Sequence, residues 1–138
     1  MTLVNLTPSQ HPVLIIEDDT FMAELLAFVL RRQGFQVLTV HDGAQAMQII
    51  EGPCSYSAVL LDLLLPRHGG LDVLTRMRQT PVWSQVPVLV LSALDKAEDI
   101  AHAFEAGADD FVTKPFNPDE LLARLKTRMA HPRRQSTP

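Results

Sequence analysis

The chain has almost none of the features that mark secreted or membrane proteins. Cys54 is its single cysteine, so no disulfide can form within the chain. Its uncharged apolar stretches are shorter than the ~18 residues that a membrane-spanning helix needs. The first residues, MTLVNLTPSQHP, lack the basic and then apolar plan of a signal peptide. These absences predict a cytoplasmic protein without a membrane segment.

An excess of basic residues is also lacking. The 12 Lys and Arg residues are outnumbered by 16 Asp and Glu residues, and the formal net charge is −4. This balance argues against a general nucleic-acid surface. Arg133 and Arg134 near the C-terminus are too few for a DNA-binding arm. We therefore expect no direct nucleic-acid binding by this chain.

The length and composition fit one folded domain. The chain has 138 residues, of which 46% are hydrophobic and 20% charged, which is enough to bury a single core. A second folded domain does not fit. We expect residues 12–130 to form the domain, residues 1–11 to be a flexible N-terminus, and residues 131–138, which contain Pro and Arg, to be a flexible tail or linker.

Apolar runs typical of strands alternate five times with stretches of helical periodicity. This alternation predicts an α/β fold, a doubly wound five-stranded parallel sheet with helices on both faces. The expected strands are 13–16, 36–40, 58–61, 86–91 and 111–113, and the expected helices are 20–32, 44–51, 71–79, 95–106 and 119–129.

Side-chain patterns refine these helices. Asp42 and Asn117 stand where helix N-caps are expected, and Gly34 and Gly107 follow the ends of two helices. The helical repeat predicts that one face of each helix packs on the sheet. The residues expected to point inward are Phe21, Leu25, Phe28 and Val29 in the first helix, Leu71, Leu74 and Met77 in the third, and Leu121, Leu122 and Leu125 in the last.

Polar residues follow four of the five predicted strands. Glu17 and Asp18 follow the first strand, Asp62 the third, Ser92 the fourth and Lys114 the fifth. The carboxyl ends of parallel strands open onto one crevice, so we expect these side chains to meet there.

Three carboxylates in one crevice require a cation to remain ionised together. Hard oxygen ligands with room for water and a phosphate suit Mg²⁺. With Lys114 added, the charges nearly cancel, and the pocket could accept an incoming phosphoryl group. We expect Asp62 to be the nucleophile.

The motifs that carry these residues resemble the receiver domain of bacterial two-component response regulators, which has a flavodoxin-like (βα)5 fold. The matching segments are IIEDD, LLDLLLPRHGGLDVL, VLVLSA and GADDFVTKPFNPDELLARL, in that order, within residues 12–130. The resemblance implies that Asp62 is the phosphoacceptor and that Asp18 binds Mg²⁺ directly. Glu17 would act through water, and the backbone carbonyl of Leu64 would be a further ligand.

The resemblance also assigns a switch. Ser92 matches the switch hydroxyl, Lys114 the lysine that contacts phosphate, and Phe111 the switch aromatic, where Tyr is commoner. The Lys114–Pro115 bond is expected to be cis, as in the family. Asp19, the third residue of the acidic run, is expected to cap the first helix rather than bind metal.

The expected partners also follow from the resemblance. A sensor histidine kinase or a phosphotransfer protein would supply the phosphoryl group, and the chain would catalyse only its own phosphorylation and dephosphorylation. The closest match is to receivers of winged-helix regulators, which dimerise through the last two helices and the strand between them. The implied cross-subunit pairs are Asp110 with Arg124 and Glu105 with Lys126. Ile100 removes the partner of a third pair.

Other functions fit less well. A phosphatase of the haloacid dehalogenase type needs a second acid two residues after its nucleophile, and Leu64 stands there. A DNA-binding transcription factor would need a helix-turn-helix, and none follows Ala130. The acidic cluster could also be a purely structural set of ion pairs. The five histidines show no metal-binding spacing. The chain could be the receiver part of a longer protein.

Overall fold

Five parallel strands form one sheet in the order β2-β1-β3-β4-β5, with continuous parallel register between neighbours. The computed structural model describes residues 11–131. The predicted flexible segments 1–11 and 131–138 therefore lie almost entirely outside the described residues. The strands are β1 (Val13–Ile16), β2 (Val37–Val40), β3 (Ala58–Leu61), β4 (Val88–Ser92) and β5 (Asp110–Thr113).

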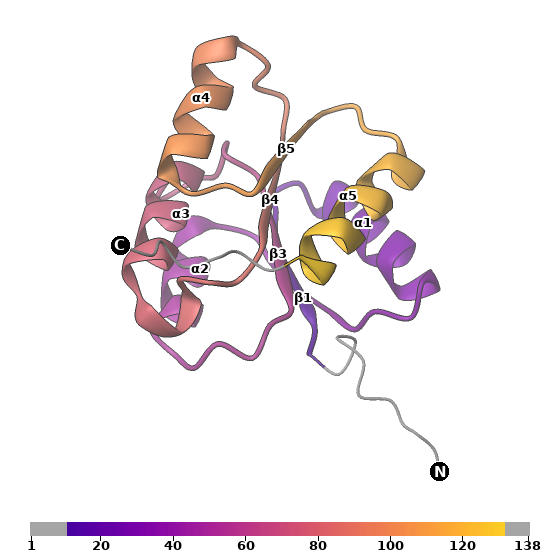
Figure 1. Ribbon diagram of the computed structural model, residues 1–138, viewed down its shortest axis with the longest axis horizontal. Coiled ribbons are helices and arrows are strands. Elements are labelled where there is room, and N and C mark those ends of the chain that lie inside the picture. Colours follow the sequence, from indigo (N-terminus) through magenta and orange to yellow (C-terminus); the bar gives the residue numbers. More distant parts are fainter. Residues whose placement is uncertain (1–10, 132–138) are drawn as a thin grey trace.

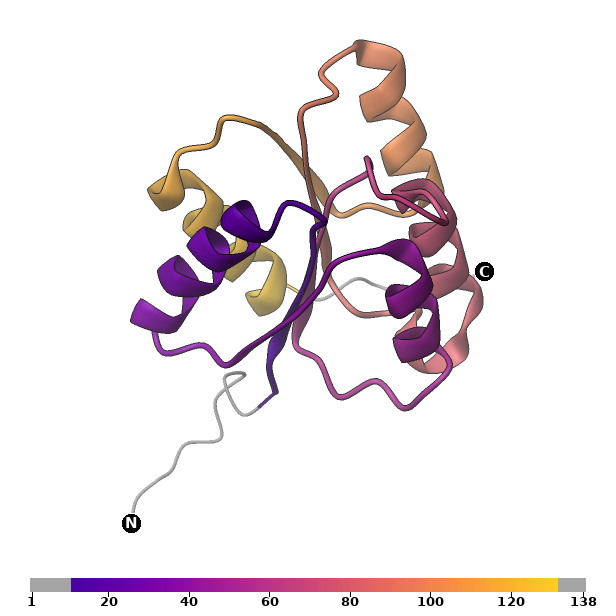
Figure 2. The same cartoon turned by 180° about the vertical axis from the view of Figure 1, so that it is seen from behind.

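Helices cover both faces of the sheet, as Figures 1 and 2 show from opposite sides. One face carries α1 (Thr20–Arg32) and α5 (Pro118–Ala130). The other carries α2 (Gly43–Ile50), α3 (Gly70–Gln79) and α4 (Ala97–Ala106), and the short 3-10 helix η2 (Pro81–Trp83) follows α3. The predicted doubly wound α/β fold is confirmed. No described helix is long and apolar enough to cross a membrane.

Each central strand is buried on both sides, which explains its uninterrupted apolar sequence. In β1, Leu14 and Ile16 pack toward the cluster under α2 and α3, whereas Val13 and Ile15 pack toward α1 and α5. All four are at most 1% exposed. The two clusters hold the sheet rigidly, so the residues that follow its strands start from fixed positions.

Helix ends agree with the predicted caps. The side chain of Asp19 accepts a hydrogen bond from the backbone N–H of Met22, and Asp42 and Asn117 cap α2 and α5 in the same way. Gly107, with a φ of 117°, ends α4 in the left-handed conformation. Strand β4 begins at Val88 rather than at the predicted residue 86, because Pro87 has no N–H to donate to the sheet.

The predicted inward face of α1 is wrong for three of its four residues, whereas Val29 is partly buried and packs against the core. Phe21 is 76% exposed, Phe28 58% and Leu25 38%. The buried residues are Ala23, Leu26, Ala27 and Leu30. The helix has apolar residues on two faces, and the smaller one packs on the sheet because alanines allow the helix to approach closely. Leu71 of α3, also expected inside, is 37% exposed.

The sheet order places the carboxyl ends of β1 and β3 at a topological switch point. From β1 the chain moves outward to β2 on one side, and it then returns to β3 on the other side of β1. The helices that follow β1 and β3 lie on opposite faces of the sheet (Figure 1). A crevice opens at such a point, and ligands of open α/β sheets bind there.

Candidate functional site

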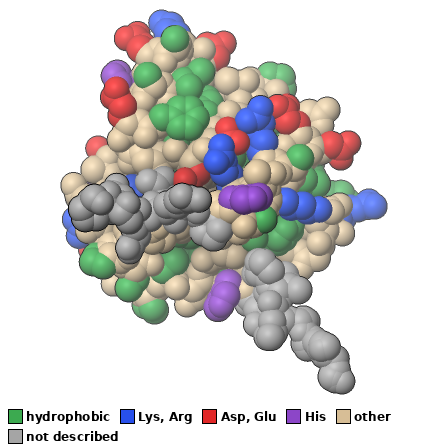
Figure 3. Space-filling model, viewed as in Figure 1, with side chains coloured by type: hydrophobic (Ala, Val, Ile, Leu, Met, Phe, Trp, Pro, Cys, Tyr) green, Lys and Arg blue, Asp and Glu red, His purple; other side chains and the backbone are tan. Residues whose placement is uncertain are grey.

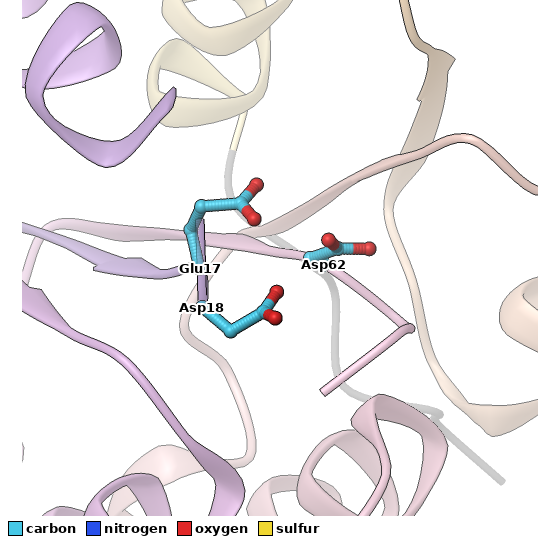
Figure 4. A group of neighbouring side chains, drawn as sticks. All are labelled: Glu17, Asp18 and Asp62. Atoms are coloured by element: carbon cyan, nitrogen blue, oxygen red, sulfur yellow. The ribbon is translucent and has the colours of Figure 1, made fainter. Parts of the chain in front are cut away.

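Glu17, Asp18 and Asp62 form an acidic cluster at this switch point. Ile16 and Leu61 are register partners in β1 and β3, so the residues that follow them are neighbours. One carboxylate oxygen from each of the three acids lies within 4.8 Å of the others. Figure 4 shows these side chains extending toward a common space. Glu17 and Asp62 are buried, whereas Asp18 is exposed to solvent.

Lys114 joins this cluster from the end of β5. Its Nζ donates to Oε1 of Glu17 at 2.7 Å and to Oδ2 of Asp62 at 3.1 Å. The backbone N–H of Lys114 donates to the carbonyl of Ser92 at 2.9 Å, which anchors the strand end. The Lys114–Pro115 bond is cis, as expected. The structure thus brings the four charged residues predicted for the site together.

Burial and pairing shift the ionisation of two of these groups. Burial raises the pKa of Glu17, and the charge of Asp62 raises it further, while the hydrogen bond from Lys114 opposes both. Burial lowers the pKa of Lys114, but its hydrogen bonds to Glu17 and Asp62 outweigh burial and raise it overall. Lys114 is therefore a cation at neutral pH, and the acids facing it outnumber it.

The residues present fit a small hard cation. Carboxylate oxygens are the ligands that Mg²⁺ prefers, and it keeps several waters when few protein ligands are available. Asp18 is exposed to solvent and Asp62 is buried, so the cluster has one solvent-accessible carboxylate and one that is held in place. A cation there would offset the negative charge that Lys114 leaves uncompensated.

Asp62 is held in a defined orientation. Its Oδ1 accepts a hydrogen bond from the backbone N–H of Leu64 at 3.0 Å, and its Oδ2 faces Lys114. Its own N–H donates to the carbonyl of Ile16 at 3.0 Å, across the switch point. The carboxylate therefore keeps its position relative to β1. The assignment of the Leu64 carbonyl as a metal ligand stays a prediction.

Ser92 and Phe111 lie on the same face of neighbouring strands. Ser92 is fully buried at the end of β4, and its Oγ accepts a hydrogen bond from the N–H of Leu94 at 3.3 Å. Phe111 of β5 is the register partner of Val90, two residues before Ser92. Its half-buried ring packs against the apolar cluster on the α4 side. This arrangement is compatible with the predicted switch roles, which stay predictions.

The predicted interface residues lie on α4, β5 and α5. Arg124 contacts Asp110 at 3.0 Å and Glu120 at 3.1 Å within the chain. Lys126 donates to Gln33 of α1 at 3.2 Å, and Glu105 is exposed on α4. Figure 3 shows acidic and basic side chains side by side on this face, next to hydrophobic atoms over α4. The pairing of these residues across two subunits stays a prediction.

Sequence reasoning missed the contribution of the loop after β2. Nδ1 of His41 lies 3.0 Å from the backbone carbonyl oxygen of Glu17. Gly43 donates its N–H to the carbonyl of Pro66, in the loop that begins with Asp62. These contacts join residues more than twenty positions apart, and no local spacing pattern reports them. From the sequence, Asp42 is predicted only as the N-cap of the following helix.

Known proteins resemble this chain across its described domain. Transcriptional regulatory protein TcrA of Mycobacterium tuberculosis is 44% identical over 114 residues, which cover 83% of this chain and 44% of that protein. DNA-binding response regulator MtrA of Mycolicibacterium smegmatis is 40% identical over 117 residues, which cover 85% of this chain and 50% of that protein. The chain thus spans about half the length of the curated relatives it matches.

A solved structure adds a comparison of the fold. The receiver domain of sensor histidine kinase PA1611 from Pseudomonas aeruginosa, with a magnesium ion coordinated in its active-site cleft, has a TM-score of 0.80 and 29% identity to this chain. The match covers 87% of this chain and 98% of that one. The family model of the response regulator receiver domain matches residues 13–126. The chain therefore belongs to the response regulator receiver domain family of two-component signalling proteins.

Proposed function

We propose that this receiver domain accepts a phosphoryl group on Asp62 and that Glu17, Asp18 and Asp62 hold Mg²⁺ for this step. The observation that carries the proposal is the position of Lys114, whose ammonium group contacts both Glu17 and Asp62. A buried carboxylate, two further acids and a fixed cation around one solvent-facing opening can position and neutralise a phosphoryl group. The magnesium ion in the PA1611 receiver supports the choice of metal.

The transfer step follows from the contacts of Asp62. One carboxylate oxygen attacks phosphorus, a new O–P bond forms, and the N–P bond of a phosphohistidine breaks with its electron pair returning to the imidazole nitrogen. Bound Mg²⁺ would supply positive charge to the phosphoryl oxygens. Lys114 supplies a second cation from the β5 side, and the N–H of Leu64 keeps the carboxylate oriented. Hydrolysis reverses the modification when water attacks the same phosphorus, the O–P bond to Asp62 breaks, and inorganic phosphate and the free carboxylate are released.

The proposed output is a conformational switch. A phosphoryl oxygen on Asp62 would draw the Ser92 hydroxyl toward it, and the ring of Phe111 would turn into the space that Ser92 leaves. Support comes from the shared sheet face of these two residues and from the incomplete burial of the ring. The change would reshape the surface formed by α4, β5 and α5, which is where a downstream partner or a second copy would respond.

The proposed phosphodonor is a sensor histidine kinase or a phosphotransfer protein in the cytoplasm. The chain acts on itself rather than on a separate substrate. Direct nucleic-acid binding is not part of the proposal for these residues, although MtrA is named as DNA-binding. That relative is about twice as long as the matched region. An effector domain in a longer protein would carry DNA binding.

Chemical phosphorylation tests the proposal. Acetyl phosphate and Mg²⁺ should add one phosphoryl group to the wild-type protein, detected by intact mass, and hydroxylamine should remove it. Asp62→Asn should take up none, because an amide oxygen is a poor nucleophile. Asp109→Asn would be an unsuitable control, because Asp109 pairs with Arg78. Asp72→Asn, on the outer surface of α3, is the matched control and should label as wild type. Labelling of Asp62→Asn would contradict the assignment.

A further inference from the structure

The loop that carries Asp62 into α3 is packed tightly against the start of α2. Gly43 donates its N–H to the carbonyl oxygen of Pro66 at 3.1 Å. A Cβ atom added at Gly43 would collide with the carbonyl oxygen of His68 and would lie 2.7 Å from that of Arg67. Both obstacles are backbone atoms, so a side-chain rotation cannot relieve the clash. Only glycine allows the loop to approach this closely.

The loop has an unfavourable backbone conformation where it meets Gly43. Arg67 has a φ of 56° and His68 a φ of 41°, and neither is a glycine. Residues with side chains adopt this left-handed conformation only at an energetic cost, so surrounding contacts must maintain it. Gly43 provides one such contact, through its hydrogen bond to the carbonyl oxygen of Pro66 and its close approach to the backbone of Arg67 and His68. Contacts with the rest of the domain, rather than intrinsic backbone preference, therefore determine the conformation of this loop.

Residues 41–45, which include Gly43, also reach the β1 side of the acidic cluster. Nδ1 of His41 lies 3.0 Å from the carbonyl oxygen of Glu17. The backbone N–H of His41 donates to Oε1 of Gln45 at 2.8 Å, and Asp42 caps the N–H of Gln45 at 2.7 Å, so the segment is rigidly tied to α2. Residues 41–45 thus contact the backbone of Glu17 on one side and the loop after Asp62 on the other.

We propose that Gly43 is a positioning residue for the phosphorylation site. By admitting the loop at residues 66–68, it sets where the segment after Asp62 lies. That segment includes Leu64, whose N–H holds Oδ1 of Asp62, so Gly43 would affect the orientation of a carboxylate that would hold Mg²⁺. This inference rests on the proposed function of that cluster. Gly43 touches neither the metal nor the phosphoryl group, and it acts through the backbone of the loop.

Two glycine substitutions separate positioning from folding. Gly69 lies in the same loop, has an extended backbone, and offers open space to a Cβ, so Gly69→Ala is the matched control for Gly43→Ala. Mg²⁺ binding is measured by isothermal titration calorimetry, and each variant is also melted thermally. Gly43→Ala should weaken Mg²⁺ binding by about tenfold, in the range seen when groups that orient metal ligands are lost. Gly69→Ala should stay within about twofold of wild type.

A second variant decides the matter if Gly43→Ala folds poorly. His68→Gly removes the His68 Cβ, which lies 2.7 Å from the added atom, and frees the backbone to turn its carbonyl away. The double variant Gly43→Ala/His68→Gly should therefore recover the melting temperature while Mg²⁺ binding stays weak, with His68→Gly alone as its background. Wild-type Mg²⁺ affinity in the double variant, or in a folded Gly43→Ala variant, would overturn the positioning role.

Acetyl phosphate labelling distinguishes this inference from the function on which it rests. Wild-type protein that binds Mg²⁺ but takes up no phosphoryl group would contradict the proposed function. If the wild-type protein labels normally and Gly43→Ala labels as fast as wild type at both low and high Mg²⁺, only the role of Gly43 would be contradicted. The supporting result is a labelling defect in Gly43→Ala that is large at low Mg²⁺ and shrinks as Mg²⁺ is raised.

Discussion

The ammonium group of Lys114 lies 2.7 Å from Oε1 of Glu17 and 3.1 Å from Oδ2 of Asp62. The lysine that would meet an incoming phosphoryl group is thus already paired with two buried carboxylates. On the proposed function, its charge would have two uses: it pairs with the acidic cluster before phosphorylation and would shift toward a phosphoryl oxygen afterwards. Stability and reactivity are therefore coupled at this residue.

Removing Lys114 should destabilise the domain in a pH-dependent way. Lys114→Ala leaves Glu17 and Asp62 buried without their cation, and we expect a loss of about 3 kcal/mol in EDTA at about pH 8. Burial, aided by Asp62, already raises the pKa of Glu17, so this acid takes up a proton as the pH falls. The loss should therefore shrink toward about pH 5.

Thermal unfolding of both proteins across this pH range measures the effect. The pKa of Lys114 is raised overall, so its pairing in the wild type is complete below the ordinary lysine pKa and is lost only at higher pH. The group whose raised pKa motivates this test is Glu17. Lys96→Ala, at an exposed position before α4, is the control and should show no such trend. A loss that is constant with pH would show that it does not arise from ionised carboxylates left without their cation.

Neighbouring acids in the run Glu17-Asp18-Asp19 should behave differently. Asp18→Ala should sharply weaken Mg²⁺ binding and phosphorylation, because it removes a carboxylate from the cluster. Asp19→Ala should instead cost ~0.5 to 2 kcal/mol of stability, since Asp19 accepts the N–H of Met22 as the cap of α1. Urea unfolding and calorimetry test both variants. Equal effects of the two on Mg²⁺ affinity would refute this division of roles.

The two apolar faces of α1 give a third prediction. Phe21→Ala should change stability by less than about 0.5 kcal/mol, because Phe21 is 76% exposed. Leu26→Ala should cost ~2 to 5 kcal/mol, because Leu26 is only 1% exposed and its removal leaves a cavity. Denaturant unfolding of the two variants measures the difference. A large loss for Phe21→Ala would show that the ring is buried in solution.

This helix also shows where sequence reasoning reaches its limit. The helical repeat correctly predicted α1, but both of its faces are apolar, and the face with Phe21 and Phe28 is the bulkier one. Hydrophobicity alone therefore selects the wrong side, because the choice depends on how closely Ala23 and Ala27 let the helix approach the sheet. The last helix has one apolar face, and there Leu121, Leu122 and Leu125 were predicted correctly.

The charged residues of the site were predictable because parallel strands end at a shared edge. Asp62 and Lys114 follow β3 and β5 directly, so strand assignment alone brought them near Glu17. The contacts of His41 and Gly43 could not be found in this way. The His41 contact depends on the side-by-side ends of β1 and β2, where Ile16 and Val40 are register partners. The Gly43 contact depends on how the loop after Asp62 folds back over α2, and that path is set by tertiary packing rather than by local preference.

The last prediction concerns the response to activation. Arg124 contacts Asp110 and Glu120 within the chain and is 42% exposed, so exchanging these contacts for equivalent ones across two subunits would cost little. Beryllofluoride with Mg²⁺ mimics a phosphoryl group on Asp62 and should raise the dimer fraction in analytical ultracentrifugation. Ser92→Ala should bind beryllofluoride but lose this response, because it removes the hydroxyl that is proposed to couple Asp62 to Phe111. Arg124→Ala should weaken the dimer without affecting beryllofluoride binding. A monomer in both states would exclude the homodimer and favour signalling through a different protein that recognises the same face.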